Sequence, residues 1–300
     1  MTDIAVIGPG AIGCAFAGAL AEAGHEIAVA GRTRVDRIVV THPAGTVEAP
    51  VRWLGEGTPD RPQRSDSLRY DIVVLATKAH QTAAAAPWIA RLCRPGTRLA
   101  VLQNGVEHRA RVGPLVADDV TIVPAIVACP SDRTAPGRVT VRGVARLDLD
   151  ATPGAADVVA AFAGSFAEVR ISDDWLSAAW RKLALNAAGG GIGVLTRRGN
   201  EVLRDPGVRA VFVAIVAEVV TVARAEGADL PDDLGDRIVD GLAQSVADHL
   251  PSIVVDRLAG RPTEWEARNE VVVRAAKRHG IAVPYNEMVT ALIRAGESAR

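Results

Sequence analysis

The sequence predicts an α/β fold in which an N-terminal, mostly parallel sheet is followed by an all-helical C-terminal domain. Short apolar runs alternate with helical stretches as far as about residue 170, and strand-like patterns are almost absent after residue 174. Of the 300 residues, 49% are hydrophobic and 23% are charged, which are ordinary globular proportions. Because a domain usually spans about 100–200 residues, we expect two domains, 1–170 and 171–300.

The first thirty residues form one βαβ unit. Ile4–Ile7 is a continuous apolar run, typical of a strand buried on both faces. Residues 14–23 have a helical composition that Gly24 ends, and Ile27–Ala30 is the next strand. The following part predicts a helix over Thr82–Leu92 and further strands. These strands are Arg37–Thr41, Asp71–Ala76, Arg98–Leu102, Val120–Cys129 and Arg138–Leu149.

Helical periodicity dominates the chain from Asp174 onward. The longest apolar run, Ala210–Ala217, is interrupted by Glu218 and is shorter than the roughly 20 residues that a membrane span needs. We therefore expect no membrane segment. The five expected helices are Trp175–Ala188, Val208–Glu226, Asp232–Ala247, Glu264–His279 and Asn286–Ala295.

Charge and cysteine content exclude some classes of protein. Lys+Arg is 34 and Asp+Glu is 35, so the formal net charge of −1 does not suit a nucleic-acid binder. Cys14, Cys93 and Cys129 are widely spaced and form no zinc-binding pattern, which predicts free thiols, no metal site and a cytoplasmic location. Only three of the 34 basic residues are lysines, and these are Lys78, Lys182 and Lys277.

A glycine-rich fingerprint lies between the first strand and the first helix. It reads Gly8-Pro9-Gly10-Ala11-Ile12-Gly13. Gly8 permits a tight turn, Gly10 lets a pyrophosphate approach the backbone, and Gly13 lets the helix pack closely on the strand. The N–H groups at the helix start then hold the phosphates. In this strand–turn–helix context the motif predicts a Rossmann-type dinucleotide site, and a turn without a ligand is the alternative.

The end of the second strand selects the dinucleotide. An NAD site usually has an acidic residue there, which accepts hydrogen bonds from the ribose 2′-hydroxyl. This chain has Gly31-Arg32-Thr33-Arg34, and a guanidinium suits a 2′-phosphate. We therefore predict NADP (NADPH) over NAD, although arginine is abundant throughout the chain.

Two other strands end in polar residues, at the edge of the sheet where ligands bind in open α/β folds. Lys78 follows the strand at 71–76 and is a candidate for contact with phosphate or substrate. Asn104 follows the strand at 98–102 and is a candidate for contact with the nicotinamide ribose or the substrate. A solvated loop lysine and a plain Asn104-Gly105 turn are the alternatives.

Two segments of the helical part carry polar groups in apolar surroundings. Lys182 and Asn186 are four residues apart, so they share one face of a largely apolar helix. A polar group there needs a partner, which a pocket supplies, whereas a snorkelling lysine is the alternative. Thr263 and Glu266 fit a capping box. Glu264 would then either stabilise the helix start or bind a substrate hydroxyl or ammonium.

Together these segments resemble the ketopantoate reductase (2-dehydropantoate 2-reductase) family, NADPH-dependent oxidoreductases of pantothenate biosynthesis. The resemblance runs almost from end to end. The residues that carry it are Gly8–Gly13, Gly31-Arg32, Lys78 with Gln81, Gln103-Asn104-Gly105, the run from Lys182 to Asn186, Asn200-Glu201, Ser252 to Asp256, Glu264, Asn269 and Gly280 to Pro284.

The resemblance implies that domain 1–170 binds the dinucleotide and that domain 171–300 binds the substrate and carries the catalysis. It also implies a role for each matching residue. Lys182 would be the general acid, giving a proton to the alkoxide that forms when hydride reaches the carbonyl carbon of a 2-oxo acid. Glu264 is implied as the second catalytic residue and as a ligand of a distal hydroxyl. Asn186 would hold the carbonyl side and Ser252 the carboxylate. Asn104 would touch both cofactor and substrate, and Lys78 and Gln81 would bind the cofactor.

One departure from the family pattern keeps alternatives open. The family has a second asparagine one turn after Asn186, where this chain reads Gly190-Gly191-Ile192-Gly193. A substrate contact is therefore missing, and we expect the end of this helix to be more flexible. A different 2-oxo acid or an imine as substrate, and a non-catalytic dinucleotide-binding protein, are the alternatives. A homodimer is possible.

Overall fold

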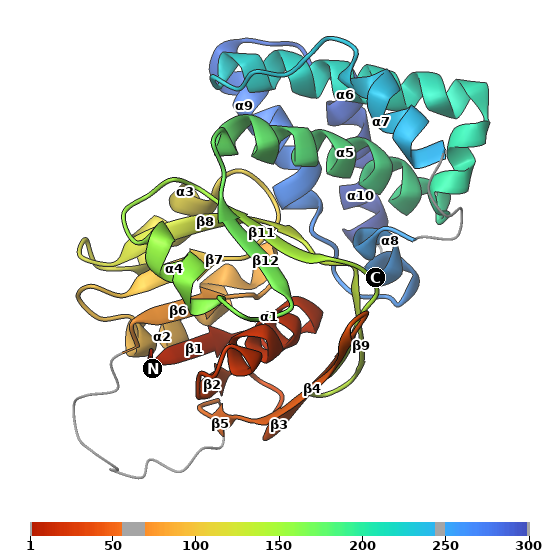
Figure 1. Ribbon diagram of the computed structural model, residues 1–300. Helices are drawn as coiled ribbons and strands as arrows, with labels where there is room; N and C mark the ends of the chain where they lie inside the picture. Colours follow the sequence, from red (N-terminus) through yellow and green to blue (C-terminus); the bar gives the residue numbers. More distant parts are fainter. Residues whose placement is uncertain (1, 56–69, 244–249, 299–300) are drawn as a thin grey trace. The chain divides into compact units, whose positions relative to one another are not determined.

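The computed structural model describes residues 2–55, 70–243 and 250–298 (Figure 1). The chain divides into two compact units. The first comprises Met1–Gln103 and His108–Trp175, and the second comprises Asn104–Glu107 and Leu176–Arg300. The assignment of dinucleotide binding to residues 1–170 and of substrate binding to 171–300 stays a prediction.

The first unit is built on an eight-stranded sheet in the order β12-β11-β8-β7-β6-β1-β2-β5. All neighbouring strands are parallel except β8 and β11, so the expected mostly parallel sheet is confirmed. The central strands are buried on both faces. The strands are β1 (Ile4–Ile7), β2 (Ile27–Ala30), β5 (Arg52–Trp53), β6 (Ile72–Leu75), β7 (Arg98–Val101), β8 (Thr121–Ala128), β11 (Ala145–Leu149) and β12 (Ala167–Ile171).

A four-stranded sheet forms a second layer of this unit, in the order β4-β3-β10-β9. Helix α1 (Ala11–Glu22) packs against strands of both sheets. Gly18 makes the approach possible, because a Cβ there would lie 2.5 Å from Cγ2 of Val40. The strands are β3 (Arg37–His42), β4 (Gly45–Pro50), β9 (Ser131–Ala135) and β10 (Arg138–Val141).

The single strand expected over Arg138–Leu149 was wrong, because the segment contains two strands in different sheets. β10 pairs with β3 and β9, whereas β11 pairs with β8 and β12. The chain leaves one sheet for the other at Arg142-Gly143-Val144. A run with strand composition does not show where a chain changes sheets, since both parts are equally apolar.

Short helices complete the first unit. Helix α2 matches its predicted range, and the remaining segments are connections that sequence patterns did not single out. They are η1 (Ala79–Gln81), α2 (Thr82–Leu92), α3 (His108–Val112), η2 (Gly113–Leu115) and α4 (Ala155–Ala161).

In the second unit, the described residues after Asp174 form helices and no strand, as expected. Their buried faces meet in one apolar core around Trp180, Phe212 and Ile253. The predicted helix over Asp232–Ala247 is described only as far as Ala243, and its remainder lies outside the described residues. The elements are α5 (Trp175–Thr196), η3 (Asn200–Arg204), α6 (Pro206–Ala225), α7 (Leu234–Ala243), α8 (Ser252–Leu258), the π-helical turn η4 (Glu266–Glu270), α9 (Val271–His279) and α10 (Pro284–Ser298).

Helix α5 does not end near Ala188, as expected, but continues through the glycines to Thr196. The greater flexibility expected of this segment stays a prediction. Gly191 lies where a Cβ would come within 2.7 Å of Cγ1 of Val289. At Gly193 a Cβ would come within 2.6 Å of Cγ2 of Val254. The glycines therefore serve close helix packing, and tertiary contacts outweigh their low helix propensity.

Helix α6 is long and apolar enough, by length and composition alone, to cross a membrane, with a mean hydropathy of 1.8. The core helix of a globular unit passes the same test. Phe212, Ile215 and Val219 of α6 are fully buried in the core of the second unit. Burial against other helices accounts for the apolar composition of α6.

Candidate active site

The glycine-rich loop of the first unit connects β1 to α1. The N–H of Gly8 donates to the carbonyl of Ala30 at 2.9 Å, and Gly8 has a φ of +97°, a value that favours glycine. A Cβ at Gly13 would lie 2.0 Å from the carbonyl oxygen of Gly8. The two glycines thus allow the turn and the close approach of helix to strand that the sequence predicted.

The same loop presents backbone donors beside open space. Gly10 is the N-cap of α1, and no side chain caps this helix. The first N–H groups of a helix have no acceptor within it. A Cβ at Gly10 would meet nothing within 4 Å. Donors, open space and the positive end of a helix fit the pyrophosphate of a dinucleotide.

Arg32 lies just beyond the end of β2, close to this loop in the fold. Gly31 approaches Pro9 so closely that a Cβ would lie 2.5 Å from the Cδ of Pro9. Arg32 is exposed, and it forms no ion pair with the residues that the structure describes. Arg34 differs, because its guanidinium is already paired with Asp36 at 2.9 Å. Arg32 is therefore the better placed of the two to meet a phosphate.

Lys78 and Gln81 follow β6 at its carboxyl end. The backbone N–H of Lys78 donates to Oε1 of Gln81 at 3.4 Å, and the N–H of Gln81 donates to the carbonyl of Lys78 at 2.9 Å. The Gln81 side chain therefore closes the turn η1. Cofactor contacts of Lys78 and Gln81 stay predictions.

Gln103 is a residue whose position the sequence patterns did not explain. It is buried at the end of β7, and its Nε2 donates to the hydroxyls of Thr82 at 2.8 Å and Thr77 at 3.1 Å. Its Oε1 accepts from Arg111 at 3.0 Å. These bonds fix the carboxyl ends of β6 and β7 to each other, so Gln103 supports the loops that follow.

In the second unit, three of the predicted site residues form one hydrogen-bonded chain. The ammonium of Lys182 donates to Oδ1 of Asn104 at 3.3 Å. Nδ2 of Asn104 donates to Oε2 of Glu264 at 3.1 Å. Residues from α5, from the loop after β7 and from the segment before η4 thus converge, although up to 160 positions separate them. The amide of Asn104 holds an ammonium and a carboxylate at its two ends.

Arg268 extends this chain and was not among the predicted site residues. Its Nη2 lies 3.9 Å from Oε2 of Glu264 and donates to Oγ of Ser252 at 3.0 Å. Burial lowers the pKa of the Arg268 guanidinium, while the charges of Glu264 and Asp256 raise it. The spacing of four residues between Glu264 and Arg268 is the sequence signal that could have revealed the pair.

Two other predicted residues have different surroundings. Asn186 is half-buried one turn after Lys182 on α5, and its side chain makes no hydrogen bond with the described residues. Asn269 is fully buried, and its Nδ2 donates to the carbonyl of Ala187 at 2.9 Å. Asn269 therefore secures α5, whereas Asn186 keeps its amide available.

The capping box expected at Thr263 and Glu266 was wrong. The hydroxyl of Thr263 is buried without a hydrogen-bond partner among the described residues. The backbone N–H of Thr263 instead donates to Oε1 of Glu297 at 3.0 Å. The helix begins with the π-helical turn η4, so Glu264 lies before the helical turns and points to Asn104. A π-turn has no simple sequence signature.

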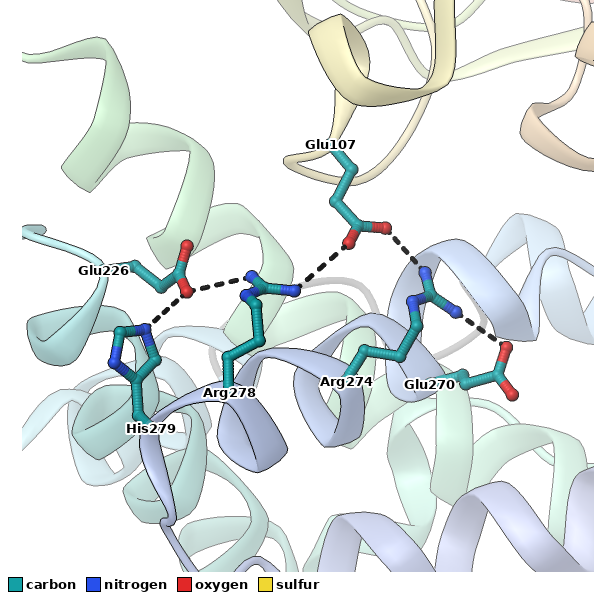
Figure 2. A network of polar contacts seen from close by, with 6 residues as sticks. All are labelled: Glu107, Glu226, Glu270, Arg274, Arg278 and His279. Carbon is teal, nitrogen blue, oxygen red and sulfur yellow. Dashed lines mark hydrogen bonds and ion pairs between the residues drawn. The ribbon is translucent and has the colours of Figure 1, made fainter.

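A network of charged residues holds the loop that carries Asn104 (Figure 2). Glu107, at the end of this loop, accepts from Arg274 at 2.6 Å and lies 3.9 Å from Arg278. Both arginines belong to α9. Arg274 also pairs with Glu270 at 2.8 Å. Ion pairs of Glu107 with α9 and the hydrogen bonds of Asn104 therefore hold this loop in place.

The other end of the network is Glu226, which accepts from Arg278 at 2.9 Å and from His279 at 2.7 Å (Figure 2). Burial alone would raise the pKa of Glu226. The hydrogen bonds and charges of His279 and Arg278 outweigh burial, so the pKa is lowered. Among the described residues, no three His, Cys, Asp or Glu side chains are grouped so that they could hold a metal ion.

A glycine-rich nucleotide loop and a chain of ammonium, amide and carboxylate groups define the class of dinucleotide-binding oxidoreductases. Comparison with known proteins gives the family. The sequence model of ketopantoate reductase PanE/ApbA matches residues 4–154, and that of the C-terminal part of ketopantoate reductase PanE/ApbA matches residues 174–297. The chain belongs to the ketopantoate reductase family.

Individual relatives agree with this assignment. The 2-dehydropantoate 2-reductase of Caulobacter vibrioides is 40% identical, over 98% of this chain and 99% of its own. The crystal structure of a ketopantoate reductase from Ralstonia eutropha superposes with a TM-score of 0.86 at 28% identity, covering 99% of both chains. A ternary structure of D-mandelate dehydrogenase with NADH and anilino(oxo)acetate has the same fold, with a TM-score of 0.86 at 22% identity, covering 99% of this chain and 98% of its own.

Proposed function

We propose that the protein reduces ketopantoate (2-dehydropantoate) to pantoate with NADPH, and that it does so in the cytoplasm. The observation that carries the proposal is the hydrogen-bonded chain from Lys182 through Asn104 to Glu264. It provides an ammonium that can give up a proton, next to groups that can hold a polar substrate. When bound, NADPH supplies the hydride.

Lys182 acts as the general acid in this proposal. Its ammonium donates to an amide oxygen, and the oxygen of a substrate carbonyl is an acceptor of the same kind. As negative charge develops on that oxygen, the ammonium stabilises the charge and then transfers the proton. Glu264 accepts a hydrogen bond from Asn104 and can accept another from the distal hydroxyl of ketopantoate.

The test is loss of NADPH absorbance with ketopantoate, in the wild type and in Lys182→Ala. We expect kcat of the variant to fall by a factor of about 10²–10⁴, while its affinity for NADPH stays unchanged. Lys277→Ala is the matched control, because Lys277 is an exposed lysine of α9 outside the hydrogen-bonded chain. Wild-type turnover in Lys182→Ala would refute the assignment.

The preference for NADPH over NADH rests on Arg32. We infer that its guanidinium binds the 2′-phosphate, since it is exposed and has no carboxylate partner among the described residues. In Arg32→Ser the preference for NADPH over NADH should fall by a factor of about 10–10², because a hydrogen bond to a charged group contributes about 1.5–3 kcal/mol. Arg34→Ser, whose arginine already pairs with Asp36, is the control and should keep the preference.

A second candidate is the same reaction on a 2-oxo acid without the distal hydroxyl. The Gly190–Gly193 stretch of α5 favours it, because it offers no polar side chain to a substrate. A panel of 2-oxo acids separates the two candidates. If kcat/KM is highest for a branched acid that lacks the hydroxyl, Glu264 does not serve as the hydroxyl ligand and the second candidate is correct.

A further inference from the structure

Arg268 is the cation of the second unit whose burial most needs an explanation. Its side chain is only 3% exposed. Of its five N–H donors, the described residues engage one in the bond to Ser252, and Nε is buried without an acceptor among them. A buried guanidinium with unused donors is costly. The structure therefore keeps a cation at a site where the described residues leave part of its hydrogen-bonding capacity unused.

The fold makes room for this guanidinium at Gly190 of α5. A Cβ at Gly190 would lie 3.3 Å from Nη1 of Arg268 and 3.2 Å from Cγ2 of Ile253. A larger side chain at this position would push against the guanidinium. Gly190 opens the stretch in which the sequence lacks the second asparagine of its family. The guanidinium of Arg268 therefore lies next to the position at which the family has its second asparagine.

The two carboxylates that act on Arg268 also interact with other groups. Glu264 and Asp256 both act electrostatically on the guanidinium. Asp256 is already paired with Arg261 at 2.9 Å. Glu264 is connected through Asn104 to the ammonium of Lys182. Neither carboxylate is therefore committed to Arg268 alone, and the guanidinium can bind a further anion.

The position of Arg268 indicates which part of the substrate it meets. Arg268 bonds directly to Ser252, the residue expected to hold the substrate carboxylate. The same Nη2 of Arg268 lies 3.9 Å from Oε2 of Glu264, which follows Asn104 and Lys182 in the hydrogen-bonded chain. A planar guanidinium binds a carboxylate through two parallel N–H bonds. The hydroxyl of Ser252 can add a further hydrogen bond to a carboxylate held in this way.

We propose that Arg268, with Ser252, binds the substrate carboxylate and so restricts the enzyme to 2-oxo acids over neutral ketones, esters and amides. This inference rests on the proposed function. Arg268 fills the place left by Gly190, and the enzyme thereby recognises the acid by an ion pair where an asparagine would offer only an amide.

The test compares kcat/KM for ketopantoate with kcat/KM for its primary amide. The wild type should prefer the acid by about 10²-fold or more, since loss of one partner of a buried ion pair has effects of this size. Arg268→Met and Arg268→Gln should reduce the preference at least tenfold, mainly through KM for the acid. Arg257→Met is the matched control, because Arg257 of α8 donates to the carbonyl of Gly296 and should keep the wild-type preference.

Folding and function are checked separately. NADPH affinity and the thermal unfolding midpoint show whether each variant is folded. If Arg268→Met does not fold, Arg268→Gln provides the test, because glutamine preserves a hydrogen-bond donor for Ser252. Wild-type preference for the acid in a folded Arg268 variant would overturn the inference while leaving the proposed function intact. A wild-type enzyme that reduces no oxo acid would overturn the proposed function, and the inference with it.

Discussion

The glycines of α5 allow a quantitative test of how the second unit is packed. Gly189→Ala adds a methyl group whose nearest neighbour outside the helix backbone would be Cε2 of Phe212 at 3.6 Å, an ordinary van der Waals distance. Alanine is favoured over glycine within a helix by about 0.8–1.0 kcal/mol. We therefore expect Gly189→Ala to stabilise the protein by up to about 1 kcal/mol.

The same substitution should have the opposite effect further along the helix. At Gly193 the new methyl group would lie 2.6 Å from Cγ2 of Val254 and 3.1 Å from the carbonyl oxygen of Arg198. The latter is backbone and cannot move away independently. Overpacking of this kind costs about 1–3 kcal/mol, which exceeds the gain in helix propensity. Gly193→Ala should therefore be destabilising by about 1 kcal/mol, and Gly191→Ala by a similar or smaller amount.

Urea unfolding followed by far-ultraviolet circular dichroism measures both effects. Gly189→Ala and Gly193→Ala are matched in chemistry and helix, so the difference of about 2 kcal/mol between them isolates the effect of packing. Because we propose that the first unit binds NADPH, the NADPH affinity serves as a control that this unit is unchanged. If Gly193→Ala were as stabilising as Gly189→Ala, close helix packing would not be the reason for the glycines.

The charged network and the thiols give three further predictions. Because the pKa of Glu226 is lowered in the folded state, its contribution to stability is present above the unfolded-state pKa near 4.5 and is lost as pH falls through the folded-state value. Glu226→Gln should therefore be less stable than the wild type by about 1 kcal/mol or less at pH 7, and urea titrations should show the difference vanishing in acid; a difference independent of pH would contradict this. Burial raises the pKa of the three cysteine thiols to about 11 or 12. At pH 8, Ellman's reagent should therefore react with the native protein about 10²-fold more slowly than with the urea-unfolded chain. Equal rates would refute this prediction. Glu107→Gln weakens the ion pairs to α9 and should lower kcat/KM for the oxo acid about 3–10-fold, which corresponds to about 1 kcal/mol. The affinity for NADPH should not change. An unchanged kcat/KM would mean that Asn104 does not need the support of these ion pairs.

Local sequence patterns were sufficient for the features that depend on neighbours along the chain. The strands Ile4–Ile7 and Ile27–Ala30 and the helix Thr82–Leu92 have the predicted bounds. The loop of Gly8 to Gly13 has the turn and helix start that its spacing indicates. In each case a few consecutive residues decide the backbone conformation, through apolar period or through the freedom of glycine.

Features that depend on distant neighbours were decided by tertiary structure. Helix α5 passes through its glycines because Val289 and Val254 pack against them. Arg268 has an ordinary place in a helical pattern, and only the fold brings it to Ser252, Glu264 and the space at Gly190.

The residue types at Lys182, Asn104 and Glu264 by themselves indicate chemistry, because an ammonium, an amide and a carboxylate have few uses in apolar surroundings. Their connection into one hydrogen-bonded chain could not be read from the sequence. Periodicity reports on contacts within a few residues, whereas the distance between side chains far apart in sequence is set by how helices pack, and packing depends on the shapes of many side chains at once.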